Sequence, residues 1–137
     1  MTINWLGPIA ALTAFFSIWF GHLAVRKVES ISPMISIPAA IFVILGIVCE
    51  WISLKAPGLH IATIFGILGM TLLFDGFELP RQQKRIIKGH APANPDNSRH
   101  SKILEHYSSA TTLDLLKRDP IRLHALVKSN RGAREKE

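Results

Sequence analysis

Three long apolar stretches, separated by short polar loops, occupy residues 1–79 of the chain. They cover residues 5–25, 35–54 and 59–77, each close to the ~20 residues that a helix needs to cross a hydrocarbon layer ~30 Å thick. Lipid offers the backbone no hydrogen-bond partners, so a helix, which pairs its own backbone groups, is the form that such stretches adopt. The pattern predicts an all-α fold with a three-transmembrane-helix bundle over residues 1–79.

A basic tail over residues 80–137 follows the bundle, and we expect it to be partly helical. From Arg81 onward it holds thirteen Lys and Arg against six Asp and Glu. Residues 81–88 continue the third helix in polar form, and Gly89 is expected to end it. Residues 90–97 are too rich in Pro and Asn for a helix, whereas residues 98–108 and 119–129 are expected to form short helices.

The basic residues in the loops predict how the chain is threaded. Arg26 and Lys27 follow the first stretch, Lys55 alone follows the second, and a basic run over residues 81–88 follows the third. Loops rich in Lys and Arg stay in the cytoplasm. We therefore expect the N-terminus outside, the first loop and the tail inside. No Lys or Arg precedes the first stretch, so we interpret it as a retained helix and not as a signal peptide.

Ionisable residues near the ends of the stretches form two candidate polar clusters. Glu50 ends the second stretch and His60 begins the third, and the tight turn between these stretches suggests that the two side chains pair near the outer interface. At the inner end the candidates are His22, Lys27, Glu29, Asp75, Glu78, Arg81 and Arg85. A proton relay, a metal site or a polar substrate contact is one interpretation. A network that sets helix packing is favoured, because every residue lies near a membrane boundary, where its side chain reaches water.

No catalytic, cofactor or metal-binding pattern is present in the sequence. The single cysteine, Cys49, has no partner for an intrachain disulfide, and the tail histidines at positions 90, 100, 106 and 124 match no ligand spacing. The tail also lacks aromatic interleaving and a zinc-finger pattern, so nucleic acid is not an expected partner. Its positive charge instead favours anionic lipid head groups at the membrane surface.

Small residues recur at helical spacing within the apolar stretches. Gly7 and Ala11, Ser17 and Gly21, and Ala62 and Gly66 are each four residues apart. Such pairs let two helix backbones approach closely, either within the bundle or between proteins.

Residues 16–29 (FSIWFGHLAVRKVE) and 65–95 (FGILGMTLLFDGFELPRQQKRIIKGHAPANP) resemble the two signature regions of a family of very small bacterial membrane proteins, domain of unknown function 4491. The resemblance covers residues 4–97. The matching positions are His22, Lys27, Glu29, Glu78, Leu79, Arg85, Lys88, Gly89, Pro92, Asn94 and Pro95. The resemblance implies a multi-pass protein of the bacterial inner (cytoplasmic) membrane, and it leaves the activity open.

The matching residues gather on the cytoplasmic side of the expected topology. We expect Glu29 and Glu78 to pair with Lys27, Arg81 or Arg85. We also expect the candidate motif in residues 89–95 to fold back against the bundle. Its members, with the residue before it, are Lys88, Gly89, Pro92, Asn94 and Pro95.

Three functions are consistent with these patterns. The first is a non-catalytic accessory or scaffold subunit of a membrane complex, bound to another membrane protein or to further copies of itself. The second is a component of proton or solute transfer, which requires an oligomer, because three helices are too few to enclose a pathway. The third is a small membrane enzyme that acts on lipid head groups with His22 as acid or base. No nucleophile or metal motif supports the third, so a non-catalytic role is favoured.

Overall fold

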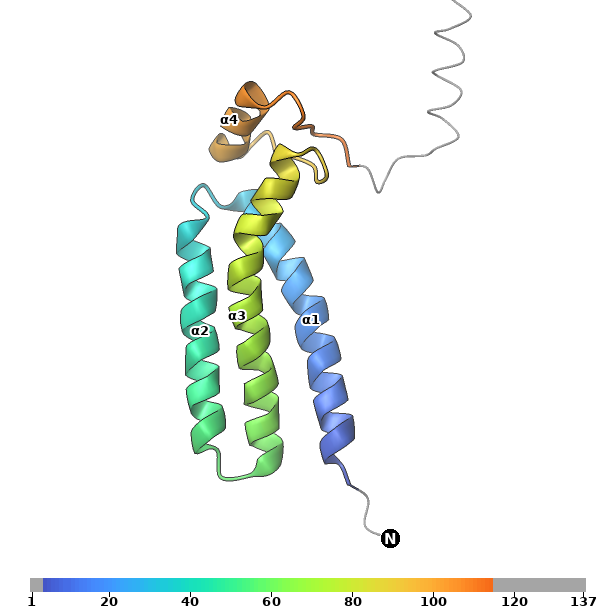
Figure 1. Ribbon diagram of the computed structural model, residues 1–137, viewed down its shortest axis with the longest axis vertical. Helices are drawn as coiled ribbons and strands as arrows, with labels where there is room; N and C mark the ends of the chain where they lie inside the picture. The colour runs from blue at the N-terminus through green and yellow to red at the C-terminus, as the bar shows by residue number, and fades with distance from the viewer. Residues whose placement is uncertain (1–3, 115–137) are drawn as a thin grey trace, which may run out of the picture.

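The computed structural model describes residues 4–114, which form four α-helices and no strand. The helices are α1 (Leu6–Ile31), α2 (Ser36–Lys55), α3 (Leu59–Ile87) and α4 (Ser98–His106). The first three lie side by side and alternate in direction, and α4 lies across one end of them (Figure 1). The predicted all-α fold with three long apolar helices is confirmed.

Three of these helices are long and apolar enough to cross a membrane, so the chain is a multi-pass membrane protein. Their large side chains point outward: Trp19, Leu54 and Phe74 are each at least half exposed. In water such a surface would be unfavourable, whereas in a bilayer it is the surface that contacts lipid tails. Two helices continue well past their apolar stretches, α1 to Ile31 and α3 to Ile87.

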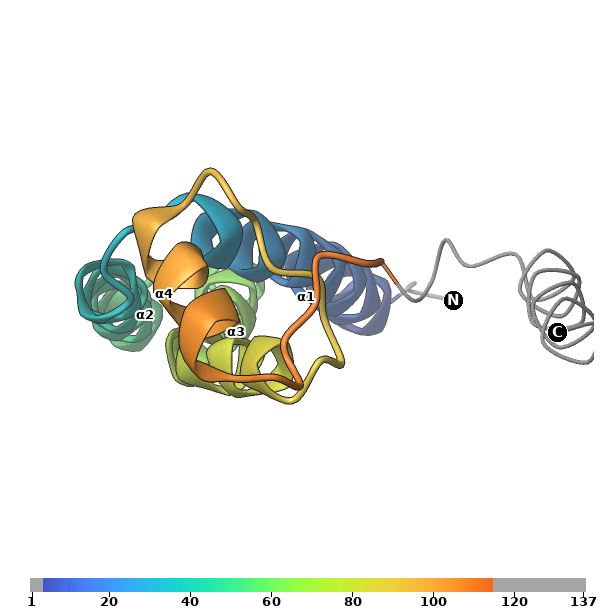
Figure 2. The same ribbon diagram turned by 90° about the horizontal axis from the view of Figure 1, so that it is seen from above.

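Helix α3 lies between the other two. Both α1 and α2 pack along it, while α1 and α2 make few contacts with each other. Figure 2, the view from above, shows α3 between α2 and the N-terminal end of α1. The three helices therefore form a row more than a closed triangle, and α3 carries the contacts that hold them together.

Glycines set the close packing of α2 on α3. A Cβ atom on Gly46 would lie 2.9 Å from the backbone oxygen of Gly69, and one on Gly69 would lie 3.0 Å from that of Gly46. Nearer the turn between these helices, the Ser53 hydroxyl donates to the carbonyl oxygen of Ala62 at 2.8 Å. In lipid, where helices associate by packing and polar contacts, this close approach stabilises the pair.

Residues 88–114 fold over the end of the bundle where α1 ends and α2 begins, which we call the capped end. The opposite end, with the α2–α3 turn, is the open end (Figure 1). A small apolar core holds this cap in place: Ile86 of α3 packs with Ala91, Ala93 and Ile103. The expected helix at residues 98–108 is observed as α4. The helix expected at residues 119–129 lies outside the described residues.

Helix α3 runs without a break across residue 80, where the predicted tail begins. Pro80 lies inside it and lacks the N–H that would bond the carbonyl of Gly76. The bundle and the start of the tail therefore share one continuous helix.

Candidate functional site

A buried carboxylate at the end of α1 is the centre of the capped end. Glu29 lies in the last turns of α1 and is only 1% exposed. Arg99 Nη2, from α4, donates to Glu29 Oε1 at 2.9 Å and to the Glu29 carbonyl oxygen at 2.6 Å. The His100 ring, fully buried, places its Nε2 3.1 Å from the same Oε1. A buried charge is thereby paired and hydrogen-bonded, as burial requires.

The contacts of His100 assign its tautomer. The backbone N–H of Asn94 donates to His100 Nδ1 at 2.9 Å, so Nδ1 carries a lone pair and not a proton. The proton of the neutral ring is then on Nε2, where it donates to Glu29. Arg99 Nη2, 3.0 Å from Nε2, uses both of its protons on Glu29 and packs against the ring without bonding it.

Two asparagines satisfy the free carbonyls that end α1. The last carbonyls of a helix have no partner within the helix. Asn97 Nδ2 donates to the carbonyl oxygens of Ser30 and Ser32 at 2.9 and 3.0 Å, and Asn94 Nδ2 donates to Ser30 at 3.1 Å. The Asn97 side chain also accepts the N–H of Arg99 and so caps the start of α4. Asn97 therefore helps to end one helix and begins another.

Gly89 turns the chain from α3 into the cap. Its φ is +73°, the left-handed region that favours glycine. The N–H of Gly89 bonds the carbonyl of Ile86 and that of His90 bonds Arg85, the pair of bonds that defines a Schellman C-cap. The carbonyl oxygen of Ser109 packs directly against Gly89, where a Cβ atom would stand. The folding back that we expected for residues 89–95 is thus observed.

The ion pairs at the capped end agree in part with expectation. Glu78 pairs with Arg85 at 3.1 Å and with Arg81 at 3.7 Å, as expected. The expectation for Glu29 was wrong: its partners are Arg99 and His100, not a residue of the basic run. The reason is geometric, because the cap carries the first turn of α4 over the end of α1. Lys27, which we expected as a counter-ion, is exposed.

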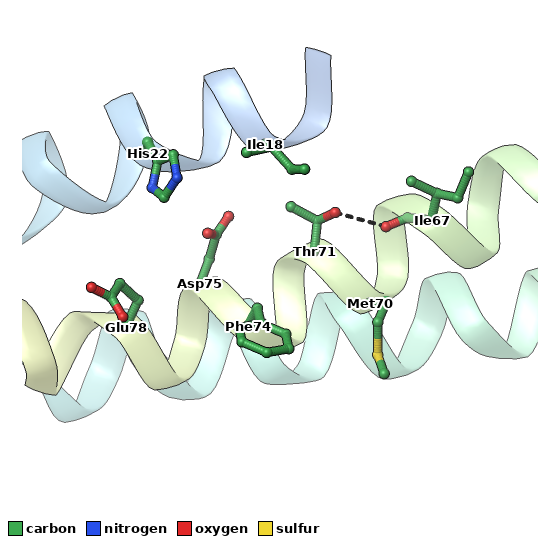
Figure 3. A pocket seen from close by; sticks show the side chains of 8 residues that line it. All are labelled: Ile18, His22, Ile67, Met70, Thr71, Phe74, Asp75 and Glu78. Atoms are coloured by element: carbon green, nitrogen blue, oxygen red, sulfur yellow. Dashed lines mark hydrogen bonds between the residues drawn. The ribbon is translucent and has the colours of Figure 1, made fainter. Parts of the chain in front are cut away.

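A groove at membrane depth lies between α1 and α3 and has a volume of about 480 Å³. We call it the α1–α3 groove. Its apolar wall consists of Ile18, Ile67, Met70 and Phe74, and its polar residues are His22, Thr71, Asp75 and Glu78. Figure 3 shows His22 on α1 facing Asp75 and Glu78 on α3. The structure therefore gathers three residues of the predicted inner cluster in one groove.

Asp75 lies between α1 and α3, against Gly21. It is 8% exposed, and its Oδ1 lies 2.9 Å from the position of a Cβ atom on Gly21. Only glycine at that position leaves space for the carboxylate. The small pair Ser17 and Gly21 thus admits a polar side chain between the helices, a use that the spacing did not predict.

The expected outer pair is not formed. No hydrogen bond or ion pair joins Glu50 to His60 within residues 4–114. Glu50 instead packs at Gly69, with its Oε1 2.8 Å from the position of a Cβ atom there. The register of the two helices explains this, because it sets Glu50 opposite Gly69, more than two turns beyond His60 on α3.

The described residues hold no group of three His, Cys, Asp or Glu side chains placed to share a metal ion. His106 bonds only the Lys102 carbonyl of its own helix at 3.1 Å, and His124 lies outside the described part of the chain. The two arrangements that remain are the bonded cap around Glu29 and the α1–α3 groove.

The chain belongs to the family described as domain of unknown function 4491, whose model matches residues 4–97. The match includes all three long helices, Glu29, and the two asparagines that bind the end of α1. It ends one residue before α4, which supplies Arg99 and His100. Comparisons with curated proteins and with solved structures found no match.

Proposed function

We propose that this protein is a non-catalytic accessory or scaffold subunit of a complex in the bacterial inner membrane. The capped end is proposed to face the cytoplasm, which is supported by loop charge: Arg26 and Lys27, with the basic run of α3, lie at that end, and only Lys55 lies at the open end. In this orientation the N-terminus is outside.

The observation that carries the proposal is the unused small-residue face at the start of α1. The glycines of α2 and α3 within the bundle all meet a neighbouring helix. A Cβ atom on Gly7, in contrast, would meet nothing within 4 Å, and Ala11, one turn further on, is exposed. Figure 1 shows this half of α1 leaning away from α3. A small and exposed pair on a splayed helix is suited to the close approach of a helix from another protein.

The form of the cap supports the same conclusion. Glu29, Asn97 and His100 use their buried polar groups to hold the cap on α1, while Nη1 of Arg99 is buried without a hydrogen-bond partner among the described residues. The basic side chains of Arg81, Lys84 and Lys88 point outward and are exposed. A fixed cap with a charged exterior is a suitable platform for a cytoplasmic partner or for acidic lipid.

The mass of the full chain purified in a mild detergent tests this proposal. We expect a defined complex with another membrane protein, and we expect Ala11→Leu to dissociate it, because the added side chain separates the two helices. The matched control is Ala40→Leu, since Ala40 is also an exposed alanine but lies on α2. A monomeric wild-type protein, or equal complex recovery from both variants, would contradict the proposal.

Proton or solute transfer is the second candidate, and the α1–α3 groove favours it. His22, Asp75 and Glu78 line one groove at membrane depth, where ionisable residues often mark a pathway. Because a row of three helices encloses no pathway, this function requires an oligomer. A symmetric homo-oligomer whose proton or solute transfer is lost in the His22→Gln variant would favour the transfer function over the subunit role.

A further inference from the structure

A hollow at the capped end lies next to the α1–α3 groove along the same two helices. Glu78 lines the groove, and its ion-pair partner Arg85 lines the hollow together with Arg26. On α1, Ile18, His22 and Arg26 follow one another at four-residue spacing and therefore share one face. A single surface thus runs from aliphatic side chains, past a polar zone, to basic side chains.

The hollow carries an excess of positive charge, so we call it the basic hollow. Its polar lining includes Arg26, Gln82, Arg85 and His90, and an adjoining hollow shares Arg26 and adds Lys27. Two carboxylates also line these hollows. Glu29 is already bound by Arg99, and Asp114 has an interaction of its own. Neither Arg26 nor Lys27 forms an ion pair within residues 4–114.

The groove as a whole, with its apolar and polar residues together, has the length of one lipid leaflet. Ile67 and Glu78 lie ~16 Å apart along α3 at the helical rise of about 1.5 Å per residue. Half of a hydrocarbon core is ~15 Å thick. Phe74 and Met70, on the wall between them, are more than half exposed, so the groove opens sideways to the bilayer.

We propose that the groove and the basic hollow together bind one anionic glycerophospholipid from the leaflet on the capped side. An acyl chain lies along the aliphatic wall, and the phosphate is held by Arg26, with Lys27 and His90 nearby. His22 lies one turn below Arg26, at the depth of the ester carbonyls, to which its ring N–H can donate. The charge of Glu78 is compensated by its arginine partners and does not repel the phosphate.

The order of apolar, polar and basic side chains along this surface favours a lipid over a helix from another protein. A helix would match the apolar wall but would leave the basic hollow without an anion. An amphiphile with a tail and a phosphate satisfies both zones at the observed spacing. The inference goes beyond the subunit role, which depends on Gly7 and Ala11 in the first turns of α1, about two turns before Ile18 on the same helix face. Separate variants, Ala11→Leu for the subunit role and Arg26→Gln for the lipid site, therefore test the two.

Lipid titration of the delipidated full chain, followed by native mass spectrometry, tests the head-group part. We expect phosphatidylglycerol to bind saturably and more tightly than phosphatidylcholine. Arg26→Gln should weaken phosphatidylglycerol binding on the order of tenfold, the loss of one charge-assisted contact. Lys84→Gln removes the same charge from the same end of the protein but outside the hollow, and should leave binding unchanged. Equal effects of the two variants would overturn the proposal, because binding would then depend on general surface charge.

A bulky side chain in the groove tests the acyl part. Met70→Trp should reduce phosphatidylglycerol binding several-fold, while Ile44→Trp, on the equally exposed face of α2, should not. Glycerol 3-phosphate without acyl chains should not compete at the same concentration, and competition equal to that of the lipid would overturn a lipid site. If Met70→Trp dissociates a protein complex and leaves lipid binding intact, a partner helix occupies the groove and the proposal is wrong.

Discussion

Removal of the Glu29 carboxylate should release the cap from α1. Glu29→Ala deletes the acceptor that Arg99 and His100 share at 2.9 and 3.1 Å. The side chain of His100 is fully buried and that of Arg99 is mostly covered, at 14% exposed. In the variant a guanidinium would remain in a site from which its counter-charge has been removed.

The size of the effect follows from that burial. Breaking one partner out of a buried ion pair costs about 3–5 kcal/mol. Undocking of the cap returns Arg99 to water, so we expect the low end of this range, about 3 kcal/mol, as a loss of cap docking and not as global unfolding. Because about 1.4 kcal/mol is a factor of ten, the population of the undocked cap should rise on the order of a hundredfold.

Hydrogen exchange of the full chain in detergent micelles is the assay. The amides of α4 should exchange on the order of a hundred times faster in Glu29→Ala, while those at the centre of α2 and α3 stay protected. Glu105→Ala is the control, because Glu105 is an exposed glutamate on α4 itself. If Glu29→Ala behaves like Glu105→Ala, or if all helices lose protection together, the cap is not held by Glu29.

Three further outcomes follow from single sites. Gly89→Ala should destabilise the cap by at least about 1–2 kcal/mol, the cost of a left-handed alanine, because its Cβ atom would also displace the Ser109 carbonyl oxygen; exchange at residues 90–106 measures the effect. Gly58→Ala, where φ is negative and the surroundings are open, should be near neutral. Glu50→Leu and His60→Leu should have additive effects on thermal stability, because the two side chains do not meet, and strong coupling would contradict the register. Glu78→Lys should reduce recovery of the complex, because it places like charge beside Arg81 and Arg85. His22→Gln should preserve the complex, because the amide keeps its hydrogen-bonding capacity. If cells with His22→Gln lose the function of the protein while the complex stays intact, the subunit role is contradicted.

The membrane fold could be predicted from the sequence because one strong signal determines it. A run of apolar residues long enough to span lipid has few alternatives to a helix, and each predicted stretch matches an observed helix, with residues 5 and 35 lying one position before the helix start. The end of α3 was also predicted, because a glycine at position 89 is typical of a helix C-cap and is observed as one. The end of α1 was less predictable, because hydropathy indicates where lipid contact stops, whereas α1 ends where Asn97 bonds its last carbonyls.

The candidate site could be predicted only where its partners lie close in sequence. Glu78 and Arg85 are two turns apart on one helix, so their pairing follows from helical spacing. Glu29 and Arg99 lie 70 positions apart, and their pairing depends on how the cap turns at Gly89 and docks. One feature of the sequence could have indicated this pairing. Asparagine at position 97 favours a helix start, which places Arg99 and His100 together in a first helical turn.

The proposed pairing of Glu50 with His60 failed for a related reason. Both residues lie near the same tight turn, and proximity to a turn suggested proximity to each other. The glycines at positions 46 and 69 bring the helices together in a register that sets Glu50 well away from His60. Small residues can be found in the sequence, but which of them face each other across two helices cannot be predicted from their positions alone.

Thiol labelling in sealed cells tests the central claim, that this is a multi-pass membrane protein whose capped end faces the cytoplasm. With Cys49 replaced by alanine, cysteines are introduced singly at Ala56, in the open-end turn, and at Ser108, on the exposed cap. An impermeant reagent should label Ala56→Cys in intact cells and Ser108→Cys only after the membrane is opened. Labelling of Ser108→Cys in sealed cells would contradict the orientation, and with it the cytoplasmic position of the cap.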